Sequence, residues 1–198
     1  TNLKEAISYA KLRGVNTHLT LNTLIKDSEF EDAILIAKKA YEFGIDAIIV
    51  QDLGLARYLI KNFPKLPIHA STQMTIHNLD GAIQAEKLGF KRVVLSRELS
   101  LEEIEYICSN TNVEIETFIH GALCYSFSGQ CLFSSVLGGR SGNRGRCAQP
   151  CRLPYAVLDE NKKEYKKESY VLSLKDLCGI EYLQQLREAG VYSLKIEG

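Results

Sequence analysis

A repeated phrase, in which a helix, a glycine and a short spacer precede a strand, most constrains the fold of this chain. It appears as FGIDAIIV (43–50), LGFKRVVL (88–95) and AGVYSLKI (189–196). Glycine suits the left-handed residue that ends a helix. The apolar run after it is typical of a parallel strand covered on both faces. The repetition predicts βα units joined in a parallel sheet.

The positions of the elements follow from these patterns. Strands are expected at residues 15–21, 46–52, 67–71, 92–98, 113–121 and 193–198. Helices are expected at residues 28–43, 54–62, 78–88, 100–109 and 179–189. Two helix starts have the spacing of a capping box, in which Ser28 precedes Glu31 and Ser100 precedes Glu103.

Polar residues at the carboxyl ends of the expected strands favour a closed barrel over a doubly wound sheet. They are Asn22, Gln51, Asp52, Ser71, Gln73, Arg97, Glu98, His120 and Glu197. A β/α barrel collects such residues into one ring, where its chemistry usually lies. A doubly wound sheet uses only the crevice where the strand order reverses. We therefore expect an α/β fold of the parallel (β/α) TIM-type barrel class.

The expected barrel is incomplete. A full barrel has eight strands and about 250 residues, whereas six strands are found here. We expect residues 1–198 to form a single partial barrel domain, with two N-terminal strands missing in front and a covering helix missing behind. Such a domain exposes a sheet edge, which predicts either homodimerisation through that edge or marginal solubility.

The composition of the chain says more about its cellular compartment than about its binding partner. Apolar residues make up 45% of the chain, as in a globular protein, and the formal net charge of zero names no partner. There is no apolar run of membrane-spanning length and no signal peptide, so a cytoplasmic location without membrane contact is expected. Six cysteines in such a protein favour metal binding or catalysis over disulfides.

The βα rhythm is interrupted between residues 121 and 170. A structureless loop of that length is improbable in a compact domain, so we expect a functional insertion at the C-terminal rim. Its second part reads as a β-hairpin with a turn at residues 159–163.

The insertion carries most of the cysteines. These are Cys124, Cys131, Cys147 and Cys151, with Cys178 following in the phrase DLC. Four thiolates gathered from loops suit zinc or an iron–sulfur cluster. Only Cys147 and Cys151 have the spacing of a zinc ligand pair, whereas a cluster tolerates irregular spacing. Buried free thiols are the alternative, which we prefer only for Cys108.

Four arginines accompany these cysteines without any acidic residue from Arg140 to Arg152. They are Arg140, Arg144, Arg146 and Arg152, and glycines lie between them. Guanidinium groups and accessible backbone amides can bind a phosphate or carboxylate. The same arginines can equally form a solvated loop or pair with acids of neighbouring elements, and both interpretations stay open.

Candidates for catalysis and substrate orientation lie at the strand ends. His120 ends a strand beside the cysteine segment, and Glu98 with Glu197 could form a carboxylate pair for acid–base work. The two glutamates could equally pair with Arg97 or with the loop arginines. Ser71 and the amide of Gln73 are suited to orienting a polar substrate. The serines form no G-x-S-x-G elbow.

The cysteine segment resembles a known signature. The stretches HGALCYSFSGQCLFSS (120–135) and GRSGNRGRCAQPCRLPY (139–155) are similar to those of peptidase family U32, the collagenase-type family, and most of all to its long branch. The phrases HASTQMTIHN, VVLSRELSLEEI, SLKDLC and SLKIEG also resemble recurring phrases of that family. The resemblance covers essentially the whole chain.

This resemblance implies two different activities. The family name implies proteolysis, but several relatives are iron–sulfur proteins involved in hydroxylating RNA bases or the ubiquinone ring. Carried over, the ligands of a [4Fe–4S] cluster would be Cys124, Cys131, Cys147 and Cys178, with Cys151 matching a ligand of one variant branch. The cluster is expected in the full-length protein, and a fragment could show free or oxidised cysteines instead.

Three hypotheses about function follow. The first is iron–sulfur-dependent hydroxylation of a base in ribosomal or transfer RNA. The second is a protease that cleaves peptides or collagen-like substrates. The third is a non-catalytic binding module whose insertion forms the partner surface.

Overall fold

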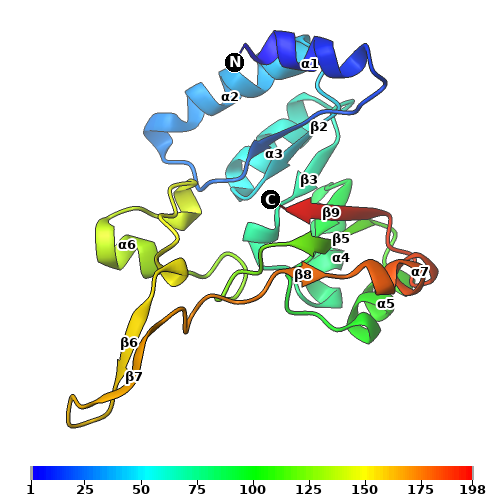
Figure 1. Ribbon diagram of the computed structural model, residues 1–198. Helices are drawn as coiled ribbons and strands as arrows, with labels where there is room; N and C mark the ends of the chain where they lie inside the picture. The colour runs from blue at the N-terminus through cyan, green and yellow to red at the C-terminus, as the bar shows by residue number, and fades with distance from the viewer. Residues whose placement is uncertain (1, 198) are drawn as a thin grey trace.

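Helices and strands alternate along most of the chain (Figure 1). The computed structural model describes residues 2–197, with the side chains of residues 165–168 outside that description. The strands are β1 (His18–Leu21), β2 (Ala47–Val50), β3 (Ile68–Ala70), β4 (Arg92–Val94), β5 (Glu114–Gly121), β6 (Tyr155–Leu158), β7 (Glu164–Ser169), β8 (Leu177–Cys178) and β9 (Ser193–Glu197). The α-helices are α1 (Leu3–Lys11), α2 (Asp27–Glu42), α3 (Leu53–Asn62), α4 (Leu79–Leu88), α5 (Leu101–Ser109), α6 (Phe133–Gly138) and α7 (Leu183–Glu188). Short 3-10 turns are η1 (Thr72–Met74), η2 (Gly142–Arg144), η3 (Pro150–Arg152) and η4 (Ile180–Tyr182).

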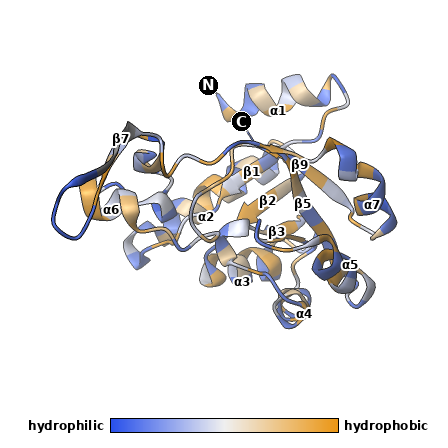
Figure 2. Cartoon of the chain, turned by 60° about the horizontal axis from the view of Figure 1, so that its bottom comes forward, coloured by the Kyte–Doolittle hydropathy of each residue, from blue (hydrophilic) through white to orange (hydrophobic). Residues whose placement is uncertain are grey.

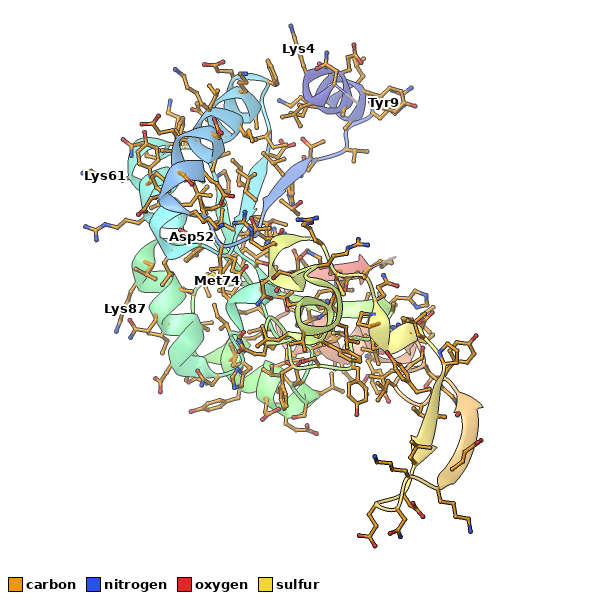
Figure 3. The ribbon with its side chains drawn as sticks, turned by 90° about the vertical axis from the view of Figure 1, so that its left-hand side faces the viewer. Lys4, Tyr9, Asp52, Lys61, Met74 and Lys87 are labelled. Carbon is orange, nitrogen blue, oxygen red and sulfur yellow. The ribbon has the colours of Figure 1, made fainter. Side chains whose placement is uncertain are left out.

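One parallel sheet organises the molecule. Its order is β1, β2, β3, β4, β5 and β9, and every neighbouring pair in that series is parallel. The sheet curves into a half-barrel with helices on its outer side, which confirms the predicted α/β class. Figure 3 shows Lys61 and Lys87 projecting outward from α3 and α4 of that outer layer. The half-barrel is open at β1 and β9, and dimerisation through an edge stays a prediction.

The insertion leaves and re-enters the sheet at one place. β8 pairs antiparallel with the end of β5, with His120 opposite Cys178 and Gly121 opposite Leu177. Between these points, β6 and β7 form a separate two-stranded sheet that extends away from the half-barrel (Figure 1). The Asp159 carboxylate accepts hydrogen bonds from the backbone amides of Asn161 and Lys163 and so closes the hairpin turn.

The apolar core lies between the sheet and its outer helices. Ile48, Ile68 and Ile115 of the strands pack against this layer together with Leu55 and Leu59 of α3, and all five are at most 2% exposed. Figure 2 shows apolar colouring on β2 and β3, beside helices whose colouring is mixed. Among the described residues, no helix combines the length and hydrophobicity needed to cross a membrane.

Charged residues occupy the opposite face of the sheet. Arg92 bonds the carboxylates of both Glu114 and Glu116 at 3.0 and 2.9 Å, and Lys195 lies 3.3 Å from Glu116. Burial alone would raise the pKa of Glu116, but Lys195 and Arg92 hold it below its usual value. Residues of β4, β5 and β9 are thereby joined by one ionic network.

Two helix starts test the expected capping boxes. The box at Ser100 is confirmed, because its hydroxyl accepts from the amide of Glu103 and Glu103 accepts from the amide of Ser100. The box at Ser28 is wrong. α2 begins at Asp27 and its N-cap residue is Lys26. The Glu29 carboxylate accepts a hydrogen bond from the amide of Lys26 at 3.0 Å.

Candidate functional site

Four of the five candidate cysteines line one cavity of about 510 Å3 between the insertion and the rim of the half-barrel. They are Cys124, Cys131, Cys147 and Cys151, and all are free thiols. Cys178 is not among the residues that line this cavity. It lies instead in β8, opposite His120.

The thiols share the cavity without closing on a common centre. Burial raises the pKa of Cys151 above its usual value, and the neighbouring Cys124 and Cys147 raise it further. Among the side chains that the structure describes, no three His, Cys, Asp or Glu residues lie close enough together to hold a metal ion. The donors fit a soft metal or iron–sulfur cluster in kind and location. Binding one would require the loops to close on it.

The loop between Cys124 and Cys131 is fastened to the rim of the half-barrel through Ser128, which is only 1% exposed. Its amide and hydroxyl both donate to the Glu98 carboxylate, at 2.8 and 3.1 Å. The hydroxyl also accepts from the amide of Arg97, and the carbonyl accepts from the Thr75 hydroxyl. Because these bonds reach residues after β3 and β4, they fix the middle of the loop from both sides.

A glycine makes this close docking feasible. Gly129 has a φ of +74°, and a Cβ placed there would come within 2.4 Å of the Gln73 carbonyl oxygen. The next residue, Gln130, donates from its side-chain amide to the Thr75 hydroxyl at 2.8 Å. The loop that carries Cys124 and Cys131 thus lies against η1, with its backbone in contact.

Two of the four candidate arginines hold the rest of the insertion in place. Arg144 makes a two-pronged ion pair with Glu29 of α2, at 2.9 and 2.5 Å, and also donates to the Leu24 carbonyl. This contact lowers the pKa of Glu29 to about 2. Arg152 donates to the Leu123 carbonyl at 2.7 Å and to Ser173 and Leu174. Both guanidinium groups are engaged within the chain rather than presented to a ligand.

The other two arginines are more accessible. Arg140 donates from Nε to the carbonyl of Arg146 at 3.1 Å and is exposed. The side chain of Arg146 is exposed and has no hydrogen bond or ion pair to any described residue. Of the four arginines, these two therefore keep most of their donors available to an anion.

The two glutamates of the candidate carboxylate pair have different partners in the structure. Glu197 lies 2.6 Å from Nη2 of Arg97, while Glu98 is occupied by Ser128. The guanidinium of Arg97 also lies over the Phe118 ring, 4.4 Å from its centroid. The paired interpretation of Glu197 with Arg97 is the one that the geometry supports.

His120 is exposed, and its ring makes no hydrogen bond to a described residue.

Ser71 and Gln73 have separate roles. The buried hydroxyl of Ser71 accepts from the amide of Gln73 at 3.2 Å and so begins the turn η1. The Gln73 carbonyl accepts from the Gln51 side chain, and the residue lines the cysteine cavity. Ser71 positions Gln73 and does not itself line that cavity.

Several residues of the site were not singled out as candidates from sequence. The cavity is also lined by Arg97, Tyr125, Phe127, Gln130 and Asn143, and Ser128 anchors its loop. In the sequence, these residues are distinguished only by their proximity to the cysteines. Arg97 is distinguished instead by its position at the end of a strand. Nothing in the serine-rich stretch distinguishes Ser128 from its neighbours.

Comparisons with known proteins identify the family of this chain. The family model for peptidase family U32 matches residues 1–198. The chain is 42% identical over 197 residues to the 23S rRNA 5-hydroxycytidine C2501 synthase of Escherichia coli K12, covering 100% of this chain and 30% of that protein. It is 32% identical to the tRNA hydroxylation protein P of the same organism, covering 100% and 54%. It is 36% identical to a collagenase of Porphyromonas gingivalis, covering 94% and 47%.

A solved structure supports the fold. The U32 peptidase Mk0906 has a TM-score of 0.62 and 16% identity, covering 99% of this chain and 75% of that one. The chain spans 30% to 54% of the three relatives named above. From the match over its whole length, the chain belongs to peptidase family U32.

Proposed function

We propose that this chain forms the catalytic part of an iron–sulfur enzyme that hydroxylates an RNA base. The observation that carries the proposal is the placement of four free thiols around one cavity at the rim of the half-barrel. Relatives named as an rRNA hydroxycytidine synthase and as tRNA hydroxylation proteins support RNA as the substrate.

Cys124, Cys131, Cys147 and Cys151 are the ligands we propose. This choice takes Cys151 over Cys178, because Cys151 lines the cavity with the other three and Cys178 does not. A bound cluster would supply one-electron redox chemistry. Through Glu98 and Arg152, the chain holds the two arms that carry the ligands, and Leu132, Phe133 and Leu172 add apolar side chains to the cavity lining.

The RNA backbone would be held by local charge. Because the formal net charge is zero, long-range attraction contributes little. Arg140 and Arg146 have donors to spare beside the cavity, so we assign phosphate contacts to these two. All six cysteines are free thiols, which suits the reducing cytoplasm that we propose as the location.

Anaerobic purification tests the cluster. A brown protein with iron and acid-labile sulfide is expected, together with broad visible absorbance. Cys151→Ala should lose iron, whereas Cys178→Ala and the control Cys108→Ala should retain it. Cys108 is a suitable control because its thiol lies on α5, where burial raises its pKa to about 11. Iron loss in Cys178→Ala with retention in Cys151→Ala would reverse the ligand assignment.

Turnover tests the reaction. The loaded protein is incubated with total RNA, and nucleosides are then analysed by mass spectrometry for the gain of one oxygen atom. A colourless anaerobic protein that cleaves peptides would favour the protease, for which the relative named collagenase is the support. Within the described residues, no histidine ring hydrogen-bonds a serine, threonine or cysteine side chain. Binding without colour or turnover would favour the module.

A further inference from the structure

Two exposed aromatic side chains line the cysteine cavity. Tyr125 is 57% exposed and Phe127 is 70% exposed, and both lie in the loop between Cys124 and Cys131. Ser128, the next residue, is buried and hydrogen-bonded to the rim. The anchor therefore fixes the backbone beside two aromatic rings that remain accessible. Rings presented from an anchored backbone bind a ligand at little cost in conformational entropy.

Three side-chain carboxamides are among the polar groups of the same cavity. Gln73, Gln130 and Asn143 line it, and Arg97 is the one guanidinium or ammonium group among its lining residues. The Arg97 charge is offset by Glu197 at 2.6 Å. A carboxamide both donates and accepts hydrogen bonds, as does the edge of a nucleobase. The cavity thus offers aromatic faces and neutral hydrogen-bonding groups, which suits a flat, uncharged heteroaromatic ring.

An extended peptide is less well matched to this cavity. Peptides of that kind commonly bind by adding a strand to a free sheet edge. The open edges of the half-barrel are β1 and β9, and neither contributes a residue to the cavity lining. At about 510 Å3, the cavity lies within the usual range for a small-molecule site.

We propose that the cysteine cavity takes a single unstacked RNA base, which stacks on Tyr125 and Phe127 and is recognised at its edge by Gln73, Gln130 and Asn143. The inference rests on the proposed function and adds the form of its substrate. A base inside a duplex cannot present its face to an aromatic side chain, so it must be unpaired or turned out of the stack. The target therefore lies in a loop, a bulge or a single strand.

Equilibrium binding of fluorescent RNA duplexes to the anaerobically purified chain tests this inference. One series carries a single bulged A, C, G or U, a second carries an abasic nucleotide at the bulge, and a third is fully paired. We expect the best bulged base to bind about 5- to 150-fold more tightly than the abasic and paired RNAs, the range found for base–aromatic stacking.

Variants assign that difference to the aromatic rings. Phe127→Ala and Tyr125→Ala should weaken binding of the bulged base and leave abasic RNA binding unchanged. Tyr125→Phe, which keeps the ring, should bind as the parent does. Tyr106→Ala is the matched control, because Tyr106 is 60% exposed on α5 and does not line the cavity. Phe127→Leu retains apolar volume without a ring and should behave like Phe127→Ala.

The results that would overturn the stacking inference differ from those that would overturn the proposed function. Equal affinity for bulged and abasic RNA, or equal weakening of both by Phe127→Ala, would overturn the stacking inference. Hydroxylated RNA formed by a protein with normal binding in both alanine variants would reject stacking and retain the function. Ring-dependent binding of the bulged base by a protein that never holds iron would retain stacking and reject the function.

Discussion

The Glu98 carboxylate accepts two hydrogen bonds from Ser128, one from its amide at 2.8 Å and one from its hydroxyl at 3.1 Å. The two residues are 30 positions apart. Ser128 lies between Cys124 and Cys131, and Glu98 follows β4 at the rim of the half-barrel. This contact therefore connects the cysteine-bearing loop to the sheet that supports it.

Removing the Ser128 hydroxyl should loosen that loop. In Ser128→Ala, Glu98 loses one donor and the amide of Arg97 loses its acceptor, so we expect the free energy of unfolding to fall by about 1–3 kcal/mol. Chemical denaturation measures this change, and iron content of the anaerobic protein should fall with it. Ser126→Ala is the control, and a loss of equal size there would show that Ser128 has no special role.

The junction of β5 and β9 should tolerate no side chain at Gly121. This residue has a φ of +118°, and a Cβ there would lie 1.6 Å from the Glu197 carbonyl oxygen. We expect Gly121→Ala to lower the free energy of unfolding by more than about 1 kcal/mol. Gly14→Ala separates strain from crowding, since Gly14 also has a positive φ but a Cβ at that position would meet no atom within 4 Å. Equal effects of the two substitutions would contradict the steric explanation.

Acid should destabilise the chain through His69. The ring is 3% exposed, and burial lowers its pKa to about 4, with Arg92 and His18 adding to the effect. Between pH 6.5 and 4 the unfolded chain binds a proton that the folded chain does not, so stability is full above pH 6.5 and falls toward pH 4. We expect a loss of about 1–3 kcal/mol over that interval.

Thermal or urea unfolding at a series of pH values measures this loss. In His69→Gln, which cannot titrate, the decline between pH 6.5 and 4 should be shallower than in the parent. His77→Gln serves as a control, because His77 is exposed and its ring bonds the Thr75 carbonyl. A decline unchanged by His69→Gln would assign the acid sensitivity to other groups.

The loop arginines should separate into two classes. Arg146→Ala should reduce the slope of log affinity against log salt concentration by about 0.7 for single-stranded RNA, because it removes one phosphate contact. Arg144→Ala should leave that slope unchanged and lower the thermal midpoint, because its guanidinium is bound to Glu29. Affinity measured between low and moderate salt distinguishes the two, and a reduced slope in Arg144→Ala would contradict its structural role.

The sequence was sufficient for the features that depend on neighbouring residues. Gly44, Gly89 and Gly190 all have positive φ values and precede the expected strands. The local cap at Ser100 was found for the same reason. At Ser28 the local pattern was misleading, because a competing carboxylate at Glu29 reaches the backbone first.

Features that depend on distant residues could not be found in this way. Arg144 meets Glu29 across 115 positions, and Arg97 meets Glu197 across 100. No spacing rule connects such pairs, so the choice between a ligand-binding arginine and a paired one stayed open. The same reason left Cys151 and Cys178 as alternatives, and the proposal of Cys151 as a ligand rests on the cavity lining, which includes Cys151 and not Cys178.

The segment between Gly121 and Leu177 begins and ends on two paired residues of adjacent strands. Because both ends of this segment are held by strand pairing, the distance between them does not depend on how many residues the segment contains. Residues added at the hairpin tip near Asn161 would cost only the slowly growing entropy of a longer loop. Proteins with this architecture could therefore differ in substrate through the length of the inserted segment alone, while the half-barrel that supports it stays the same.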